Sequence, residues 1–302
     1  MRTETVRRLG LTLVLAVAVL AAIFLSVQLP RVTASPLGVT RTYPGAAPCD
    51  TSLQACIDGS ADGDVINIAA NVYITGVTLN KAVSLIGANA AGTIIQALPG
   101  QRVLTATAPM NDDTQIAHLT FQGGNAGAAN GGGIFLSAGA QPLIHDVVLN
   151  ANFGQSGGGI YASSSITLIN VTITNNTATN GSGGGGYVAG SVLIVDSVIQ
   201  NNTVITNGYG GGLLTTAHFT GTNVNFINNT VNNGYDGGGL YASGALKVTG
   251  GQFINNRTTK PKGYGGGGGA MAFGRSDISG TLFRGNSYRI KGEVVPGLTP
   301  SE

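Results

Sequence analysis

The carboxylates are the side chains of this sequence that could carry out hydrolysis, and they are sparse. Asp112 and Asp113 form one adjacent pair, and four more are widely spaced between residues 131 and 286: Asp146, Asp196, Asp236 and Asp277. Glycoside hydrolysis needs two carboxylates held several ångströms apart. Asp146 and Asp196 stand where other repeats have asparagine or glycine (Asn170, Asn223 and Gly250), so we interpret both as turn residues. The sequence predicts no catalytic residue.

Metal-ligating side chains are equally sparse. His118, His145 and His218 stand singly in the sequence, and Cys49 and Cys56 are its only cysteines. A structural zinc site needs four Cys, His or carboxylate ligands brought together. No further Cys or His lies near the two cysteines, so the sequence predicts no metal and no cofactor.

Triple glycines recur down the second half of the chain and mark a repeated structural unit. The side chains named above have to be positioned by these repeats. The interval between successive triplets is nearly constant at about 26 residues, lengthening at the last step, and a period of this size is the signature of a repeat architecture. The triplets begin at Gly131, Gly157, Gly183, Gly210, Gly237 and Gly267.

Each repeat also contains a short apolar strand that runs into an asparagine, as in Ile-Thr-Asn-Asn at 173–176. A coil of one such period holds three short strands and three turns, and stacked coils bury strands that could form no core alone. We therefore predict an all-β chain that forms a parallel β-helix, or solenoid, within residues 48–290, with about eight or nine coils.

The glycines and asparagines are explained as corners of this coil. Glycine permits a sharp turn where stacked side chains would collide, and asparagines repeated at one corner would form a hydrogen-bonded ladder. Asn-Xaa-Thr triplets begin at Asn170, Asn175, Asn201 and Asn228; we interpret these as ladder asparagines rather than glycosylation sites. The corner asparagines are Asn152, Asn176, Asn202, Asn229, Asn256 and Asn286.

A stripe of large side chains recurs four residues after the first glycine of each triplet. If the preceding residue points inward, as the alternation at Ile134 and Ile160 suggests, this one points outward. Aromatic rings so placed could stack on sugars or anchor a protein partner, or could simply shield the backbone. The stripe positions hold Phe135, Tyr161, Tyr187, Leu214, Tyr241 and Met271, and the ligand-binding candidates are its aromatic members, Phe135, Tyr161, Tyr187 and Tyr241. A weaker second set is Tyr209, Tyr235 and Tyr264.

The N-terminal part differs from the repeats. Residues 35–47 contain Pro36, Pro44 and Gly45 and are predicted to be a linker, and Asp50-Thr51-Ser52 precede a short amphipathic helix. Gly63-Asp64 then lead into a strand at 65–68, and Val72-Tyr73 and Leu85-Ile86-Gly87 follow. This order resembles the opening of pectin-lyase-like β-helices. The resemblance implies a right-handed β-helix whose first coil is covered by the helix.

The repeats carry two further resemblances. Their pairing of GG[AG][ILV] with FxxN, between residues 121 and 286, is similar to the repeats of chlamydial polymorphic outer membrane proteins and related bacterial surface β-helices. That likeness implies display at a bacterial surface. Arg289-Ile290-Lys291 resembles a tripeptide of polygalacturonases, but the Asn-Xaa-Asp, Asp-Asp and Gly-His-Gly signatures that precede it in that family do not stand in the right places. We interpret this match as coincidental.

Residues 1–34 are predicted to be a signal peptide or an uncleaved N-terminal anchor. A basic start precedes an apolar run over 9–27, and small residues precede Ser35. Without this leader the chain has 11 basic and 12 acidic residues, a net charge of −1 that gives no reason to expect nucleic-acid binding. In an exported chain Cys49 and Cys56 are expected to form a disulfide. Residues 291–302 are predicted to be a polar tail.

The sequence thus predicts a secreted or surface-displayed repeat protein without enzymatic activity. We expect it to bind a polysaccharide or a cell-surface protein, and to touch a membrane only through residues 9–27 if these are retained. The alternative is a pectin-lyase-like polysaccharide lyase or hydrolase with an unrecognised site.

Overall fold

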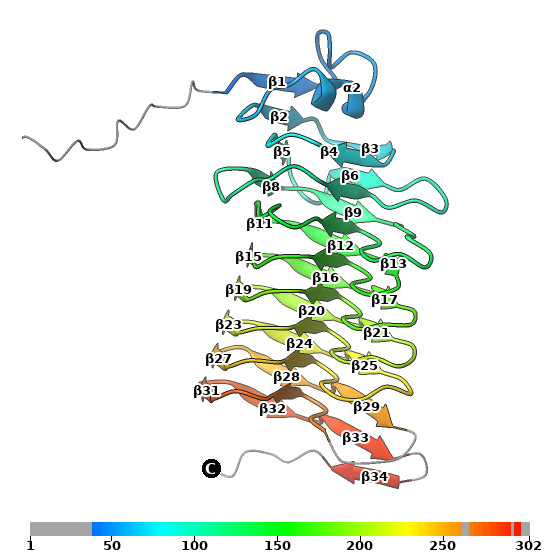
Figure 1. Cartoon of the computed structure of the whole chain (residues 1–302), viewed down its shortest axis with the longest axis vertical. Coiled ribbons are helices and arrows are strands. Elements are labelled where there is room, and N and C mark those ends of the chain that lie inside the picture. Colours follow the sequence, from blue (N-terminus) through cyan, green and yellow to red (C-terminus); the bar gives the residue numbers. More distant parts are fainter. Residues whose placement is uncertain (1–37, 261–265, 291–292, 297–302) are drawn as a thin grey trace, which may run out of the picture. The chain divides into compact units, whose positions relative to one another are not determined.

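The computed structural model describes residues 38–260, 266–290 and 293–296. The predicted leader (1–34), most of the predicted tail (291–302), Tyr264 and Lys291 of the Arg-Ile-Lys tripeptide lie outside these ranges. Within the described part, no helix has the length and apolarity needed to cross a bilayer. The described strands from β1 to β33 form a parallel β-helix, as the repeats predict, and stack coil upon coil (Figure 1), and β34 pairs antiparallel with β33 at the end.

Two sheets of the helix contain the strands that follow the glycine triplets and the strands after the next turn. The eight-stranded sheet consists of β4 (Val77–Leu79), β7 (Leu104–Ala106), β10 (Ile134–Leu136), β14 (Ile160–Ala162), β18 (Gly186–Val188), β22 (Leu213–Thr215), β26 (Leu240–Ala242) and β30 (Ala270–Ala272). The ten-stranded sheet consists of β1 (Thr40–Tyr43), β2 (Val65–Ile68), β5 (Ser84–Gly87), β8 (Gln115–Ala117), β11 (Leu143–His145), β15 (Ile166–Ile169), β19 (Val192–Val195), β23 (Phe219–Thr222), β27 (Leu246–Thr249) and β31 (Ser276–Ser279).

The third sheet contains the strands that run into the paired asparagines. This nine-stranded sheet consists of β3 (Asn71–Ile74), β6 (Thr93–Gln96), β9 (Thr120–Gln122), β12 (Val148–Asn150), β16 (Thr172–Thr174), β20 (Val198–Gln200), β24 (Asn225–Ile227), β28 (Gln252–Ile254) and β32 (Leu282–Arg284). Because each coil contributes one strand to it, the described part of the chain contains nine coils. That number agrees with the eight or nine predicted.

A fourth, seven-stranded sheet was not predicted. It consists of β13 (Phe153–Gly154), β17 (Thr177–Ala178), β21 (Thr203–Val204), β25 (Thr230–Val231), β29 (Arg257–Lys260), β33 (Ser287–Ile290) and β34 (Glu293–Pro296). The prediction of three strands per coil is therefore wrong for the regular coils, which have four. Most of these strands are two residues long, too short for an alternating pattern to show in the sequence. Ala178, Val204 and Val231 form a small core of their own beneath this sheet.

The main core fills the space between the other three sheets, and it is built from inward residues that repeat at each coil. Ile160, Leu168 and Ile173 represent the three sheets in one coil, and all are fully buried. In the last three coils of the nine-stranded sheet the inward position is aromatic, and Phe226, Phe253 and Phe283 stack with ring centroids 4.7 and 4.8 Å apart.

The buried corner, between the nine-stranded and seven-stranded sheets, is an asparagine ladder. Asn176 Nδ2 donates to Asn202 Oδ1 at 3.0 Å and to the carbonyl of Leu149 at 2.9 Å, and the same two bonds recur in successive coils. The Oδ1 atom also accepts the backbone N–H of the preceding ladder residue. Every polar atom of these amides is thereby paired. The ladder contains Asn152, Asn176, Asn202, Asn229, Asn256 and Asn286.

The glycine triplets have two separate roles beside this ladder. In the triplets from Gly131 to Gly237 the first glycine turns the corner in the left-handed region, as Gly157 does at φ +61°. The third makes room for the amides: a Cβ on Gly159 would lie 2.6 Å from the carbonyl oxygen of Gly185 and 3.0 Å from the amide of Asn176. The third glycine of a triplet therefore leaves the space that the amide of a ladder asparagine occupies.

The Asn-Xaa-Thr asparagines are not part of the ladder, so that prediction is wrong. Asn175, Asn201 and Asn228 each stand one residue before a ladder asparagine, are exposed, and have φ near +55°. Asn170 belongs to the exposed corner, between the ten-stranded and nine-stranded sheets, where a residue with positive φ recurs in each coil. The exposed corner contains His118, Asp146, Asn170, Asp196, Asn223, Gly250 and Gly280. The interpretation of Asp146 and Asp196 as turn residues agrees with these φ values.

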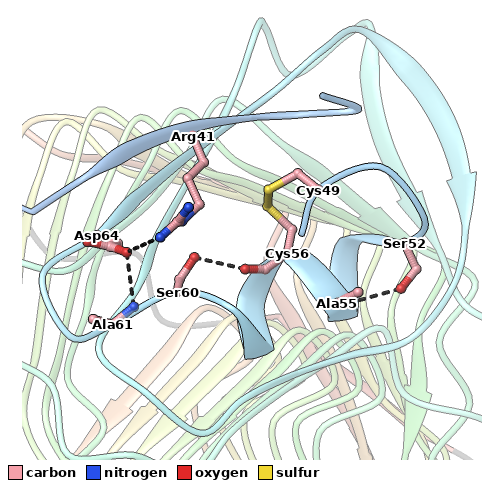
Figure 2. Close-up of a disulfide and its surroundings, with 8 residues drawn as sticks. All are labelled: Arg41, Cys49, Ser52, Ala55, Cys56, Ser60, Ala61 and Asp64. Carbon is pink, nitrogen blue, oxygen red and sulfur yellow. Dashed lines mark hydrogen bonds and ion pairs between the residues drawn. A yellow bond between two sulfur atoms is a disulfide. The ribbon is translucent and has the colours of Figure 1, made fainter. Parts of the chain in front are cut away.

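The N-terminal coil is covered by α2 (Leu53–Asp58), the helix that the sequence predicts, and Figure 2 shows its surroundings. Ser52 caps α2 by accepting the N–H of Ala55 at 3.0 Å, and a disulfide joins Cys49 to Cys56. Beside α2, the buried carboxylate of Asp64 accepts the N–H groups of Val39 at 2.7 Å and Ala61 at 2.9 Å.

Part of the predicted linker belongs to the same cap. Thr40–Tyr43 form β1, which pairs in parallel with β2, so the linker prediction is wrong for this segment. Its β-branched and aromatic residues favour a strand. The linker was predicted because Pro44 and Gly45, which are typical of loops, follow directly. The guanidinium of Arg41 on β1 lies 3.4 Å from the carboxylate of Asp64, and this ion pair holds β1 against the cap.

Candidate functional site

The predicted aromatic stripe lies on the outer face of the eight-stranded sheet. Phe135, Tyr161 and Tyr187 are the central residues of β10, β14 and β18 and are aligned by the strand register. Ile134 and Ile160, the residues before them, are fully buried. The inward and outward assignment therefore agrees with the structure.

The faces of these rings, however, cover one another. The centroids of Phe135 and Tyr161 are 5.6 Å apart and those of Tyr161 and Tyr187 are 5.0 Å apart, with 6° between the planes in both pairs. The guanidinium carbon of Arg102 lies 4.9 Å from the Phe135 centroid and covers its outer face. A sugar ring stacks on an aromatic face, and this stack presents half-buried edges. The expectation of an exposed stripe is therefore wrong.

The stripe is also interrupted. Leu214 on β22 is 5% exposed, and beyond it Tyr241 contacts Tyr209 and Phe273 at 4.6 and 5.8 Å. Tyr209 in turn stacks on Tyr235 at 4.7 Å, so Tyr241 belongs to the second aromatic set. Burial, with a smaller effect of Tyr209, raises the pKa of Tyr241 above its ordinary value.

A groove lies elsewhere, on the outer face of the ten-stranded sheet, and it was not predicted. It has a volume of about 510 Å³ and follows β11, β15, β19 and β23 across four coils. Its floor is a register-aligned column of outward residues, in which leucine alternates with threonine. The column is Leu143, Thr167, Leu193 and Thr220.

One wall of the groove is polar and follows the turns that precede the same strands. It contains Ser165, Ser191 and His218, with Gln141 and Asp112 at the other end. Ser165 Oγ accepts the N–H of Ser191 at 3.0 Å, and His218 Nδ1 accepts the N–H of Ala245 at 3.0 Å. The proton of a neutral His218 is thereby placed on Nε2.

The groove combines features suited to an extended hydroxylated ligand. Leu193 is 43% exposed and offers an alkyl surface in the middle of the floor. Serine and threonine hydroxyls stand at the spacing of the coils, about 4.8 Å. Hydroxyl periodicity of this kind could have been found in the sequence by aligning the outward positions of the repeats, but only with the register known.

Coil stacking also brings together two histidines that stand singly in the sequence. His118 and His145 occupy successive coils, and their rings meet edge to face with centroids 5.4 Å apart. Asp146 Oδ2 lies 2.7 Å from His145 Nδ1 and 3.8 Å from His118 Nδ1. His218 is not part of this cluster. The separation of the two histidines by one repeat period was the signal that could have revealed it.

The carboxylate of this cluster is ionised at neutral pH. A hydrogen bond with His145, opposed by burial and aided by Asn170 and the nearby histidines, lowers the pKa of Asp146 below its ordinary value. Asn170 Nδ2 donates to Asp146 Oδ1. The side chains of His118, His145 and Asp146 are 41%, 21% and 34% exposed, so the cluster is open to solvent.

Comparison with known proteins gives one finding. A family model described as right handed beta helix region matches residues 109–287, which is more than half of the chain. Neither the curated proteins nor the solved structures include a match to this chain.

Proposed function

The chain belongs to the right-handed β-helix family, and from this premise we propose that it is an exported, non-enzymatic repeat protein that binds a polysaccharide in the groove over the ten-stranded sheet. The observation that carries the proposal is the groove itself. Its floor repeats leucine and threonine at every second coil, beside a polar wall, a regularity suited to a polymer of repeating units. The disulfide between Cys49 and Cys56 supports export, because such bonds persist in oxidising compartments.

The ligand class follows from the side chains of the groove. Four strands at about 4.8 Å spacing give a floor on the order of 15 Å long, enough for a short run of sugar units. Leu143 and Leu193 can cover the apolar faces of sugar rings, while the hydroxyls of Thr167 and Thr220 can bond their substituents. Asp112 is the carboxylate of the lining, so a neutral polymer fits better than a strongly acidic one.

The same lining argues against hydrolysis. Inverting and retaining glycosidases place two carboxyl groups about 5 to 9.5 Å apart. Asp112 precedes β8 and His218 precedes β23, and these strands are four spacings apart, on the order of 19 Å. The two titratable groups of the groove are therefore too far apart to act on one bond.

The proposal is tested with the mature protein on an array of pectins, xylans and bacterial exopolysaccharides, followed by titration with the strongest ligand. Replacing the floor (Thr167→Ala, Leu193→Ala and Thr220→Ala together) is expected to weaken binding by about tenfold or more. These side chains are at the surface, so the fold should survive, and thermal melting checks this.

The matched control removes part of the stripe on the other sheet. Tyr161→Ala with Tyr187→Ala is expected to leave the affinity within about twofold, because the ring faces are already covered. Loss of binding in this control, with binding retained in the floor variant, would move the site to the stripe. Release of reducing ends or unsaturated products from any bound polymer would show an enzyme. Binding of a surface protein without binding of any glycan would show that the ligand is a protein and not a polysaccharide.

A further inference from the structure

We propose that His118, His145 and Asp146 form a binding site for a divalent transition-metal cation of the zinc type. Each residue offers one ligand atom, and the three atoms all lie within 4.8 Å of one another. Two imidazole nitrogens and a carboxylate oxygen are the donor set that zinc and its neighbours in the first transition row prefer. The site is distinct from the proposed polysaccharide groove and does not depend on it.

The fold itself brings the three ligands together. β11 pairs with β8 so that His145 lies beside Ala117. The next residues, His118 and Asp146, are then successive members of the exposed corner, with φ of 56° and 54°. Histidine, like asparagine and aspartate, is enriched among the non-glycine residues with a left-handed backbone, and here that backbone places His118 and Asp146 at the same corner of successive coils.

The distances suit a cation between the ligand atoms. Zinc binds nitrogen and oxygen at about 2.0–2.2 Å, so ligand atoms around a tetrahedral ion are roughly 3.3 Å apart. The separations of 2.7 and 3.8 Å from Asp146 Oδ2 to the two Nδ1 atoms lie on either side of this value. The two histidine nitrogens lie within 4.8 Å of each other, so they have to approach by up to about 1.5 Å, which rotation of the partly exposed side chains allows.

Surrounding side chains orient two of the ligands. Gln115 Oε1 lies 3.2 Å from His145 Nε2, and Asn170 Nδ2 donates to Asp146 Oδ1. When the ring proton of His145 is on Nε2 and is donated to Gln115, Nδ1 carries the lone pair that a metal needs, and Asp146 offers Oδ2. Partners of this kind, which fix the tautomer and the free oxygen, accompany most protein metal ligands.

A proton competes with the metal at the centre of the cluster. The 2.7 Å separation of His145 Nδ1 and Asp146 Oδ2 is that of a hydrogen bond in which Nδ1–H donates to the carboxylate, the contact that lowers the pKa of Asp146. A cation that binds both atoms has to displace this proton, and the experiment has to separate the two occupants.

The site would hold its cation in an open manner. Three protein ligands leave at least one position of a tetrahedral ion for water or an external ligand. The exposures of 21–41% mean that a hydrated ion can reach the site without any rearrangement of the core.

The test uses the untagged mature protein, stripped with EDTA and dialysed, and titrated with ZnCl₂ by calorimetry. We expect saturable binding at a single site, and a visible d–d spectrum of low-symmetry coordination when CoCl₂ replaces zinc. His145→Ala is expected to abolish both signals. Asp146→Asn, which preserves shape and turn preference, is expected to weaken zinc binding by about tenfold or more.

His218→Ala is the matched control, because it removes a histidine outside the cluster. It should leave the zinc affinity and the cobalt spectrum unchanged. The proposal is overturned if the wild-type chain binds no zinc, if His145→Ala and Asp146→Asn bind as the wild type does, or if His218→Ala loses binding to the same extent as His145→Ala. A proton-only cluster would give the first of these results.

Discussion

The buried and exposed corners flank the same nine-stranded sheet, and they differ in what they demand of a side chain. Both turn the chain through a residue with positive φ. At the buried corner the next residue is asparagine in six successive coils, from Asn152 to Asn286. At the exposed corner the turn residue is histidine, aspartate, asparagine or glycine. One position is uniform and the other varies.

The hydrogen bonds explain this difference. A ladder asparagine has to donate twice and accept twice in a space without water, and no other side chain of its size does so. At the exposed corner the one requirement is a residue that can adopt a left-handed backbone, which asparagine, aspartate and glycine do most easily. Uniform positions are therefore explained by architecture, whereas at a free position such as that of His118 the choice of residue is left open to other uses.

Breaking the ladder is expected to have the largest effect on stability. Asn202→Ala removes the acceptor of the Asn176 N–H and side-chain amide, and the donor to the carbonyl of Ile173. Three buried groups then each lose a hydrogen bond, at roughly 1–3 kcal/mol each. The free energy of unfolding should fall by about 4 kcal/mol, measured by urea titration with far-UV circular dichroism.

The residue before it provides the matched control. Asn201 is exposed with φ 55°, and glycine suits that backbone, so Asn201→Gly should change the free energy of unfolding by no more than about 0.5 kcal/mol. Equal losses in the two variants would mean that the turn, rather than the ladder, stabilises this corner.

Filling the space beside the ladder is expected to have the next largest effect. In Gly159→Ala the new Cβ would lie 2.6 Å from the carbonyl oxygen of Gly185 and 3.0 Å from the Asn176 amide, so the backbone of two coils has to separate. We expect a loss of about 3 kcal/mol in the free energy of unfolding. Thermal melting and urea titration both measure it.

Gly127→Ala is the matched control for Gly159→Ala. Gly127 has φ +58° with no atom within 4 Å of an added Cβ, so the variant suffers only the left-handed strain of about 1–2 kcal/mol. A loss for Gly159→Ala no greater than that for Gly127→Ala would remove the close approach as the reason for the triplet.

Much of the fold could be predicted because its causes repeat. The glycine period indicated the coil, the alternation around Ile160 indicated the inward face, and the Ser52 cap and Leu53 indicated α2. The two-residue strands of the seven-stranded sheet could not be found, since their pairing depends on the neighbouring coils. The error over Asn175 and Asn201 arose from a shift of one residue, which exchanges an exposed corner position for a buried one.

The candidate sites were harder to predict because they depend on register between coils. The stripe of Phe135, Tyr161 and Tyr187 was located from its spacing, but the orientation of the rings toward one another is a tertiary result. The groove column and the meeting of His118 with His145 likewise arise only when residues from successive coils are placed side by side. Sequence intervals close to one repeat period contain that information once the coil length is known.

Acid titration extends the comparison to two carboxylates, with the smallest expected effects. Burial alone raises the pKa of Asp64, but the N–H groups of Ala61 and Val39 and the charge of Arg41 outweigh it, so the pKa is lowered. A lowered pKa stabilises the fold above the unfolded value of about 3.9, and that stability is lost as the pH falls through the folded value. Asp64→Asn should therefore lower the free energy of unfolding by roughly 1–2 kcal/mol at pH 7 and by progressively less below pH 4.

Asp146 is the comparison. It is one-third exposed, so Asp146→Asn in EDTA should lower the free energy of unfolding by less than about 0.5 kcal/mol at any pH. Melting temperatures from pH 2 to 7 decide the point: a larger acid-dependent difference for Asp146→Asn would contradict the rule that buried, backbone-bonded positions determine the stability of this helix.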